Sequence, residues 1–342
     1  MGKMLDRSCQ INQFVTASGW GNTPRRLVAG DASNRRYERL EKADGSTLIL
    51  MDAPTEKGED IRPFVAIARH LRAMGLSAPE IHFSDTDLGL LLIEDLGDAL
   101  FARVVQATPT MERPIYDAAI DVLTAQHAAP APDLAPYDAA TMTPLAALAF
   151  HWYQLGTKDA LDQTTLAEFE AKFRALLSPL DTAQRVLIQR DFHAENLLWL
   201  PDRKGVARVG LLDFQDAMSG HPAYDLVSVL QDARRDVDPE LERAMIERYL
   251  DQNPQDRDAF ISAYALLGLQ RNLRILGVFA RLCMRDGKAH YVDLIPRVWG
   301  HIQTNLRHPA LGSLRPLIDT LPAPTEKILE RLKAKCATVQ KL

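Results

Sequence analysis

The pattern of apolar and polar positions divides the chain into a strand-rich beginning and a helical remainder. Apolar positions predict strands at residues 26–30, 35–41 and 47–54, and a polar turn, GDAS, joins the first two. Residues 59–74 place apolar side chains at helical spacing, and Gly75 is a plausible end for that helix. EIHFSD and GLLLIEDLG predict two more strands, the second nearly all apolar and therefore buried. The first hundred residues are thus expected to form strands around one helix.

The pattern then becomes mostly helical. Residues 111–128 and 144–156 have helical spacing and are separated by a proline-rich loop. Two short apolar runs, NLLWL and ARVGLLDF, interrupt the helices, and the pattern is helical again from Pro222 onward. We therefore expect an α+β fold with two lobes. A small β-rich lobe covers residues 1–97, and a larger helical lobe covers 98–342.

Composition and charge narrow the class of protein. The 342 residues are 46% hydrophobic and 25% charged, as in ordinary globular proteins, and the net charge of −5 argues against a nucleic-acid partner. Three widely spaced cysteines form no CxxC pair, which argues against a disulfide scaffold or a structural zinc site. The chain shows no signal region and no apolar run of membrane-spanning length. We expect a cytoplasmic protein with no membrane association and no obligate protein partner.

The segments QRDFHAENLLWL and VGLLDFQDA carry the strongest chemical signal. Asp191 and Asn196 lie five residues apart just before a predicted strand, and Asp213 follows the next strand. This spacing suits phosphoryl transfer, in which one carboxylate accepts the proton of an acceptor hydroxyl. A carboxamide and a second carboxylate then hold a metal against the nucleotide phosphates. Ligands that offer only oxygen indicate Mg²⁺ rather than a transition metal.

This D-x(4)-N then D-F pattern resembles the catalytic and metal loops of the protein-kinase-like superfamily. It is most similar to the aminoglycoside phosphotransferase branch, whose loops read H-G-D-x-H-x-x-N and I-D-x-x-D-A. HPAYDL, at residues 221–226, resembles that branch's G-D-P-x-x-D-L, so the resemblance covers nearly the whole chain. It implies that Asp191 is the catalytic base and that Asn196 and Asp213 bind Mg²⁺. It also implies that Asp225 anchors the catalytic loop through hydrogen bonds.

The nucleotide side departs from the family pattern at its phosphate-covering turn. GDASNRR resembles that turn, although the glycine-rich GxGxxG is absent. Gly30 allows the backbone to turn, while Ser33 and Asn34 can donate to phosphate oxygens. An ordinary hairpin turn is the alternative. The resemblance further implies a hinge that reads adenine through a backbone carbonyl at Glu94 and an amide at Leu96.

The third strand lacks the lysine that usually pairs with the phosphates. LILMDAP has Met51 or Asp52 in that place. We expect Arg35 or Arg36, on the neighbouring strand, to supply the positive charge instead. Side chains alternate across a strand, so only one of the two can face the nucleotide. Glu59, a candidate for the acid of the helix, is left without an obvious partner.

The acceptor side is marked by arginines. The segment LQRNLRILGVFARLCMRDG places Arg271, Arg274, Arg281 and Arg285 near one helical stripe. If this stripe faces the site, it favours an anionic acceptor, because a guanidinium group binds a carboxylate bidentately. A solvated basic face is the alternative.

Finer features are similar to one bacterial subgroup of the branch. DASNRRY, LILMDAP, LLLIEDLG, LLDFQDA and QRNLRILGVFARL resemble the anomeric kinases of cell-wall recycling, which phosphorylate N-acetylmuramate and N-acetylglucosamine at C1. This resemblance implies ATP and an amino sugar as substrates, and the carboxylate of muramate agrees with the arginines. His193, Arg271, Trp152 and Tyr153 are then candidate substrate-binding residues. Trp152 and Tyr153 would stack on the sugar ring, and packing in the core is the alternative for both.

Two other functions remain open on the sequence alone. Another small-molecule kinase of the same branch would act on choline, a different sugar or an aminoglycoside. A nucleotide-binding pseudokinase scaffold would account for Met51 in the place of the lysine. The combination of Asp191, Asn196 and Asp213 favours an enzyme, because a scaffold has no chemical need for all three.

Overall fold

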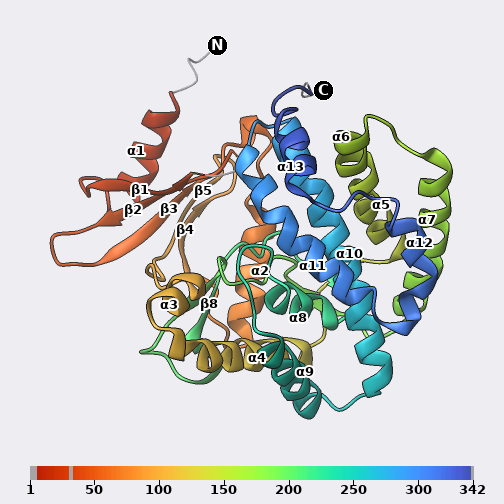
Figure 1. Ribbon diagram of the computed structural model, residues 1–342. Coiled ribbons are helices and arrows are strands. Elements are labelled where there is room, and N and C mark those ends of the chain that lie inside the picture. The colour runs from red at the N-terminus through yellow and green to blue at the C-terminus, as the bar shows by residue number, and fades with distance from the viewer. Residues whose placement is uncertain (1–5, 31–33, 340–342) are drawn as a thin grey trace. The chain divides into compact units, whose positions relative to one another are not determined.

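The computed structural model describes residues 6–30 and 34–339 (Figure 1). Internal contacts divide the chain into two units, each of which is discontinuous in sequence. Unit 1 comprises Met1–Ala125 and Ala194–Ala217, and unit 2 comprises Gln126–His193 and Met218–Leu342. The two units differ in kind, because unit 1 contains the five-stranded sheet and unit 2 is mostly helical.

Unit 1 is built on an antiparallel sheet with the strand order β1-β2-β3-β5-β4 (Figure 1). All five strands expected from the sequence are present. Leu48 and Leu50 are buried at alternate positions of β3, whereas the four consecutive apolar residues 90–93 of β5 are all buried. The strands are β1 (Arg25–Gly30), β2 (Arg36–Glu41), β3 (Thr47–Asp52), β4 (Ile81–Asp85) and β5 (Leu90–Glu94).

A helix that the apolar pattern did not predict, α1 (Arg7–Ala17), packs against this sheet. Its Val15 joins Leu40 of β2 and the apolar residues of β3 and β5 in one buried cluster. The predicted helix at residues 59–74 is present as α2 (Arg62–Ala73). Phe64 of α2 stacks on Phe214 with ring centroids 4.9 Å apart, which fixes the chain directly after the predicted metal loop.

Unit 1 also contains a short β-hairpin. The hairpin consists of β7 and β8, and the amide of Leu211 donates to the carbonyl of Ser77 at 3.0 Å. This bond ties the hairpin to the segment that follows α2. The remaining elements of unit 1 are α3 (Phe101–Ala107), most of α4 (Glu112–Ala128), β7 (Leu197–Trp199) and β8 (Val209–Leu211).

Unit 2 is organised around one long helix, α10 (Arg257–Met284), which is in contact with α5, α8 and α11. Gly277 permits the approach to α5, since a Cβ atom there would lie 2.2 Å from the carbonyl carbon of Leu148. The other helices and strands described in this unit are α5 (Ala139–Leu148), a π-helical segment (Ala149–Gln154), α6 (Leu155–Lys158), α7 (Gln163–Leu177), α8 (Ala223–Leu230), α9 (Pro239–Gln252), α11 (Ile295–Asn305), α12 (Arg315–Ile318), α13 (Glu326–Lys333) and the paired strands β6 (Val186–Ile188) and β9 (Met218–Gly220).

Short 3₁₀ turns link several elements in both units. They are Thr55–Lys57, Pro109–Met111, Ser178–Thr182, Gly205–Arg208, Ala289–Leu294 and Pro309–Leu314. Within the described part of the chain, no helix has the length and apolar character needed to cross a membrane.

The lobe boundary that we expected at residue 97 remains a proposal. Internal contacts group α3, most of α4 and the β7–β8 hairpin with the sheet. A hydrogen bond from the hairpin to Ser77 explains why the hairpin groups with the sheet. The two partners lie far apart in the sequence, so the apolar pattern could not predict their contact.

Candidate functional site

The predicted catalytic loop of unit 2 follows β6 and is anchored by Asp225. The carboxylate of Asp225, on α8, accepts the backbone N–H of Gln189 at 2.6 Å and that of Arg190 at 2.9 Å. These two bonds confirm the anchoring role expected for Asp225. Arg190 itself has a left-handed backbone, with φ of 72°. Such a conformation is costly for a residue with a Cβ atom and is found where the surroundings enforce it, often at functional sites.

Asp225 is fully buried, and this shows in its protonation. Burial raises its pKa to about 7, although the two backbone N–H bonds act in the opposite direction. The carboxyl therefore depends on those bonds to remain ionised at neutral pH. The carboxylate of Asp225 is a buried hydrogen-bond acceptor for the loop backbone and not a candidate for contact with substrate.

Asp191, the predicted base, stays ionised for a different reason. Burial would raise its pKa, but the positive charges of Arg274 and Arg271 and the nearby His193 hold that pKa below its usual value. A carboxylate in this state can accept a hydrogen bond from a substrate hydroxyl. It is suited to orienting the hydroxyl more than to removing its proton beforehand.

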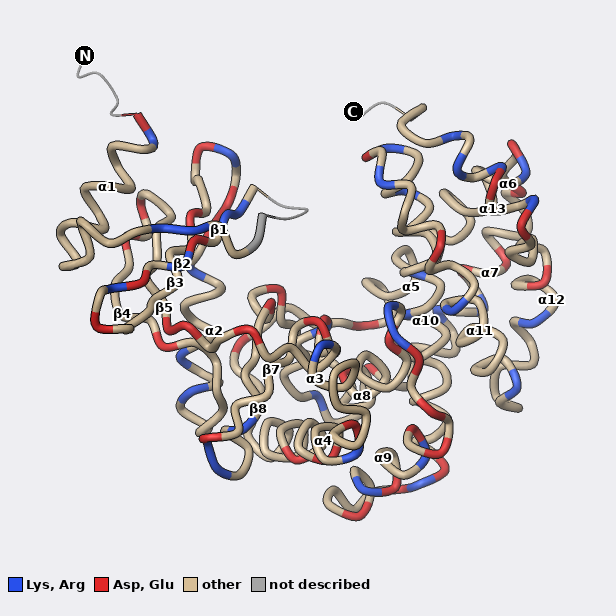
Figure 2. The backbone as a smooth tube through the Cα atoms, turned by 60° about the vertical axis from the view of Figure 1, so that its left-hand side comes forward, with Lys and Arg blue, Asp and Glu red and all other residues tan. Residues whose placement is uncertain are grey.

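The two α10 arginines near Asp191 are not neutralised by direct ion pairs. Arg271 is 3% exposed, and its Nη1 donates to the carbonyl of Gln231 at 3.4 Å, while its Nε has no partner. Nη1 of Arg274 donates to the hydroxyl of Tyr224 at 3.4 Å. Among the described residues, no carboxylate lies within ion-pair distance of either guanidinium. Figure 2 shows the charged residues along α10.

The other half of the predicted arginine stripe behaves differently. Arg285 forms an ion pair with the adjacent Asp286 at 2.9 Å, and Arg281 is about half buried. Burial lowers the pKa of Arg281, and the like charge of Arg285 adds to that effect. The solvated-face alternative therefore describes Arg285, whereas Arg271 and Arg274 have a buried, charged neighbourhood.

His193 lies in the same neighbourhood and is neutral at physiological pH. Burial lowers its pKa to about 4, although Asp232 opposes this shift. Its backbone N–H donates to the carbonyl of Asp191 at 3.1 Å, and its Nε2 lies 3.5 Å from Nη1 of Arg234. His193 therefore shapes the loop that carries Asp191, and its low pKa does not suit it to proton transfer near pH 7.

Unit 1 contains both predicted metal ligands. Nδ2 of Asn196 lies 3.4 Å from Oδ2 of Asp213, and the backbone N–H of Leu212 donates to the carbonyl of Asn196 at 3.0 Å. Asp213 is exposed and has a left-handed backbone, with φ of 58°, so this loop holds a second strained residue. Nε2 of Gln215 donates to the other carboxylate oxygen of Asp213 at 2.7 Å.

This donor set fits Mg²⁺. One carboxylate and one carboxamide are hard oxygen ligands, and Mg²⁺ in nucleotide sites takes its other ligands from phosphates and water. Over residues 6–30 and 34–339, no group of three or more His, Cys, Asp or Glu side chains is arranged to hold a metal.

Arg35 and Arg36 differ in their exposure and in their partners. The side chain of Arg35 is 15% exposed, and its Nε donates to Glu59 at 2.8 Å. Arg36 is 59% exposed and pairs with Glu38 on the same strand. Burial alone would lower the pKa of Arg35, but the hydrogen bond to Glu59 leaves that pKa raised. Glu59, which lacked a lysine partner in the sequence, thus finds an arginine.

Tyr37 belongs to the same cluster, and the sequence analysis missed it. Burial raises its pKa to about 12, while Arg35 opposes the shift and Asp213 adds to it. Tyr37 lies on β2, two residues after Arg35, which directly precedes that strand. Met51, in the place of the lysine, pairs with Tyr37 across the sheet and is completely buried. The strand alternation was the available signal for Tyr37.

The predicted phosphate-covering turn is only partly described. Gly30 ends β1 and pairs with Arg36, whereas Ser33 lies outside the described residues. The backbone N–H of Asn34 donates to Glu59 at 3.1 Å, and its Nδ2 lies 3.4 Å from the carbonyl of Lys57. Glu59 therefore holds both Asn34 and Arg35.

The predicted hinge is stabilised by charged side chains from both sides. Arg39, on β2, forms hydrogen bonds of 2.8 Å to Asp95 and 2.7 Å to Asp98. The side chain of Glu94 pairs with Arg72 and Arg203, and Leu96 is 9% exposed. These contacts restrain the segment whose backbone is predicted to read adenine. Arg39 was missed because nothing in the sequence relates it to Asp95.

The aromatic pair predicted to bind sugar is split by the structure. Both residues lie in the π-helical segment, but Tyr153 is completely buried and donates its hydroxyl to the carbonyl of Pro322 at 2.8 Å. Its ring centroid lies 6.4 Å from that of Trp299. Core packing therefore describes Tyr153, whose ring offers no face for a sugar, and this corrects our expectation. Trp152 is partly exposed and remains a candidate.

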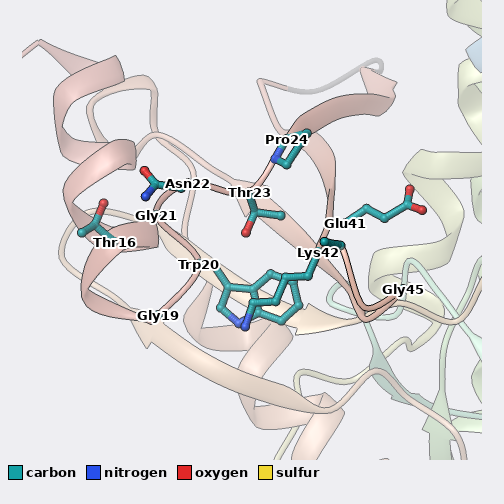
Figure 3. A pocket seen from close by; sticks show the side chains of 11 residues that line it. Thr16, Gly19, Trp20, Gly21, Asn22, Thr23, Pro24, Glu41, Lys42 and Gly45 are labelled. Atoms are coloured by element: carbon teal, nitrogen blue, oxygen red, sulfur yellow. The ribbon is translucent and has the colours of Figure 1, made fainter.

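A pocket of about 800 Å³ lies elsewhere in unit 1 (Figure 3). It is formed by the chain after α1 and the turn between β2 and β3. The ammonium group of Lys42 lies 4.0 Å from the ring centroid of Trp20, as the close view shows. None of the predicted site residues lines this pocket, whose walls are Thr16, Gly19, Trp20, Gly21, Asn22, Thr23, Pro24, Glu41, Lys42, Ala43 and Gly45.

Comparisons with known proteins find relatives over most of the chain. A model of the phosphotransferase enzyme family matches residues 25–260. A protein of Caulobacter vibrioides named N-acetylmuramate/N-acetylglucosamine kinase is 41% identical, with 94% of this chain and 99% of that protein covered. A protein of the same name from Pseudomonas aeruginosa is 34% identical, with 93% and 95% covered.

Solved structures support the protein-kinase-like fold. A choline/ethanolamine kinase family protein from Mesorhizobium loti has a TM-score of 0.61 at 12% identity, with 96% of this chain and 100% of that chain covered. An ADP-bound aminoglycoside phosphotransferase has a TM-score of 0.58 at 13% identity, with 88% and 98% covered. With the family match over most of the chain, these likenesses lead to one conclusion. The chain belongs to the phosphotransferase enzyme family and is itself a phosphotransferase.

Proposed function

We propose that the protein transfers the γ-phosphoryl group of ATP to the anomeric hydroxyl of an amino sugar, N-acetylmuramate or N-acetylglucosamine. The observation that carries this proposal is the ionised Asp191 beside the buried Arg271 and the partly buried Arg274, neither of which forms an ion pair within the described residues. This combination suits a hydroxyl acceptor that also presents oxygen-rich or anionic groups. Relatives with 31–41% identity over most of the chain, named for these two sugars, support the same substrates.

Asp191 is the proposed catalytic base. An anomeric hydroxyl is more acidic than an ordinary alcohol, so Asp191 needs chiefly to orient it and to accept its proton as transfer proceeds. The bonds from Asp225 to Gln189 and Arg190 hold the loop in position for this task. Preorganisation of this kind reduces the reorganisation needed during the reaction.

Asn196 and Asp213 are the proposed Mg²⁺ ligands. When bound, Mg²⁺ would neutralise charge on the nucleotide phosphates. We assign Arg35 to the phosphates in place of the missing lysine, with Glu59 fixing the direction of its guanidinium group. Tyr37 limits the room around Arg35 and keeps water away from it.

The remaining roles are divided between nucleotide and sugar. Gly30, Ser33 and Asn34 would cover the phosphates, and the backbone at Glu94 and Leu96 would bind adenine. His193, Arg271 and Trp152 would contact the sugar. Such an enzyme would act in peptidoglycan recycling, where these two sugars are released.

The test is ATP consumption with a panel of acceptors, followed by phosphorus NMR of the product. N-acetylmuramate and N-acetylglucosamine are compared with kanamycin and choline. We expect a sugar 1-phosphate from the first two only. Transfer to kanamycin or choline instead would assign another acceptor, and stabilisation by Mg-ATP with no transfer at all would indicate a nucleotide-binding scaffold.

Two variants test the assigned roles. Asp191→Ala and Asp213→Ala are each expected to lower kcat by about 10³-fold or more, since each removes a group that acts on the reacting atoms. Asp202→Ala, which removes an exposed aspartate from the turn between β7 and β8, is the matched control and should leave kcat unchanged. Near-normal turnover by Asp191→Ala would refute the assignment of the base.

A further inference from the structure

Arg234 lies in the loop between α8 and α9 and carries an exposed positive charge. Its backbone N–H donates to Oδ1 of Asp232 at 2.8 Å, which fixes the start of the loop. Its Nη1 lies 3.5 Å from Nε2 of His193. Within the described part of the chain, no carboxylate forms an ion pair with Arg234. By contrast Asp236, two residues further on, is held by Arg297 through bonds of 2.6 and 3.0 Å.

This position places Arg234 beside the catalytic loop of unit 2. His193 is bonded through its backbone to Asp191 and directs its ring nitrogen toward Arg234. Arg271 donates a hydrogen bond to the carbonyl of Gln231, at the start of the loop that carries Arg234. His193 is neutral, because burial lowers its pKa to about 4. The exposed charge next to the proposed sugar site is therefore that of Arg234.

The two proposed sugars differ at one group. N-acetylmuramate carries a lactyl ether with a carboxylate, and N-acetylglucosamine has a free hydroxyl in its place. The anomeric hydroxyl that reacts at Asp191 is common to both. A residue that distinguishes them must therefore offer a cation that lies near Asp191 but takes no part in holding its charge.

Arg234 meets this requirement and Arg271 does not. Arg271 helps to hold the pKa of Asp191 below its usual value, so its removal would affect both sugars. Arg234 does not contribute among the main causes of that shift. It is also exposed, so a carboxylate can reach it while keeping part of its hydration, which avoids the cost of burying a charge.

We propose that Arg234 binds the lactyl carboxylate of N-acetylmuramate and is a specificity-determining residue of the acceptor site. The inference rests on the proposed function, since it assumes that both sugars are phosphorylated. Arg234 takes no part in the reaction of N-acetylglucosamine. Its guanidinium group favours binding of the acidic sugar and does not act in the chemical step.

The test compares kcat/KM for the two sugars in Arg234→Gln and in the unaltered protein, at fixed ATP and low ionic strength. We expect kcat/KM for N-acetylmuramate to fall about tenfold or more, mainly through KM, as for a lost charge-assisted hydrogen bond. For N-acetylglucosamine it should change less than about twofold. Arg234→Lys should recover part of the loss, because an ammonium group keeps the charge without the bidentate geometry.

A matched control removes the same charge elsewhere in unit 2. Arg243, on α9, is exposed and contacts only its own helix, so Arg243→Gln should leave both values unchanged. An equal fall for both sugars in Arg234→Gln, or no change for either, overturns the proposal. Unaltered protein that phosphorylates only N-acetylglucosamine also overturns it. Unaltered protein that phosphorylates neither sugar refutes the proposed function itself, which separates the two failures.

Discussion

Three arginines of unit 1 and two arginines of α10 in unit 2 have different kinds of partner. In unit 1, Arg35, Arg39 and Arg203 each pair directly with a carboxylate, namely that of Glu59, Asp95 or Glu94. In unit 2, the buried Arg271 and the partly buried Arg274 donate, within the described residues, to a carbonyl and a tyrosine hydroxyl. Their charge is balanced at longer range by Asp191. Acidic and basic residues along the strands and helices of each unit can be followed in Figure 2.

This difference distinguishes arginines with a structural role from arginines that we propose to bind ligand. A paired arginine recovers part of the free energy lost on leaving water, and so it can hold a hinge or a loop in place. A buried arginine without a direct partner does not recover that free energy inside the protein. Its retention is explained when an anionic or oxygen-rich ligand completes its surroundings. The arginines of α10 are therefore assigned to ligand binding, and Arg39 to structure.

The largest expected effect comes from removing the unpaired charges. Arg271→Met or Arg274→Met should lower kcat/KM by about 100- to 1,000-fold, because the positive surroundings of Asp191 and the acceptor are lost. The free energy of unfolding should not fall, since a buried charge has been replaced by an apolar chain. Steady-state kinetics and urea unfolding measure the two quantities. Arg285→Met, which removes a paired arginine from the same helix, is the control.

The next effect should appear in unit 1 when one member of a paired set is removed. Arg39→Met is expected to lower the free energy of unfolding by about 3 kcal/mol, because it leaves the buried Asp95 without its partner. Urea unfolding checks this value. Arg36→Met, at an exposed pair on the same strand, should cost less than about 0.5 kcal/mol. A small effect at both positions would contradict the contrast between paired and unpaired arginines.

The comparison of the two units also applies to stability at acid pH. The histidines whose pKa is lowered by burial belong to unit 2. Burial lowers the pKa of His127 to about 3, while its Nδ1 lies 2.7 Å from the hydroxyl of Tyr249. Between its unfolded pKa near 6.5 and that value, the native state binds fewer protons than the unfolded state. Stability supplied by His127 is therefore present above pH 6.5 and is lost as the pH falls.

The variant His127→Gln isolates this contribution. By pH 5, the unaltered protein should have lost about 2 kcal/mol more of its unfolding free energy, relative to pH 7, than the variant. Urea unfolding at the two pH values gives this difference. The comparison with the variant is needed because Asp225 acts in the opposite direction, its raised pKa adding stability as the pH falls toward its unfolded value. Equal slopes in the two proteins would contradict the role of His127.

The smallest effect should come from the nucleotide pair. Glu59→Gln is expected to raise KM for ATP about tenfold with less change in kcat, because Arg35 and Asn34 both lose a charged acceptor. Steady-state kinetics at saturating sugar measures this. Glu56→Gln, an exposed glutamate in the preceding turn, should leave KM unchanged. No change in KM for Glu59→Gln would argue against Arg35 as the phosphate cation.

The strands of unit 1 could be predicted because their signals are local, and the anchoring role of Asp225 could be predicted because HPAYDL resembles a motif of the family. Apolar side chains at β spacing mark β3 and β5, and HPAYDL places an acid at the start of α8. The helix α1 gave no such signal. Its burial of Val15 becomes visible only when Leu40 and Leu48 bring the sheet beneath it.

Neighbouring residues with similar sequence signals were separated by burial. Arg35 and Arg36 are adjacent, as are Trp152 and Tyr153, and the sequence offered the same role to both members of each pair. Arg35, directly before β2, is largely buried beside Glu59, whereas Arg36 is exposed. The π-helical segment leaves Trp152 partly exposed and buries Tyr153 against Pro322.

By itself, the sequence determined the order of the five strands of the sheet in unit 1, the residue types at the two loops and the family, because each of these is marked by short segments of the chain. Tertiary structure decided which charges are neutralised. Arg39 meets Asp95 and Asp98 across more than fifty residues, and Arg234 approaches His193 across 41. The free energy of a buried charge depends on its neighbours in space, and spacing along the chain does not contain them.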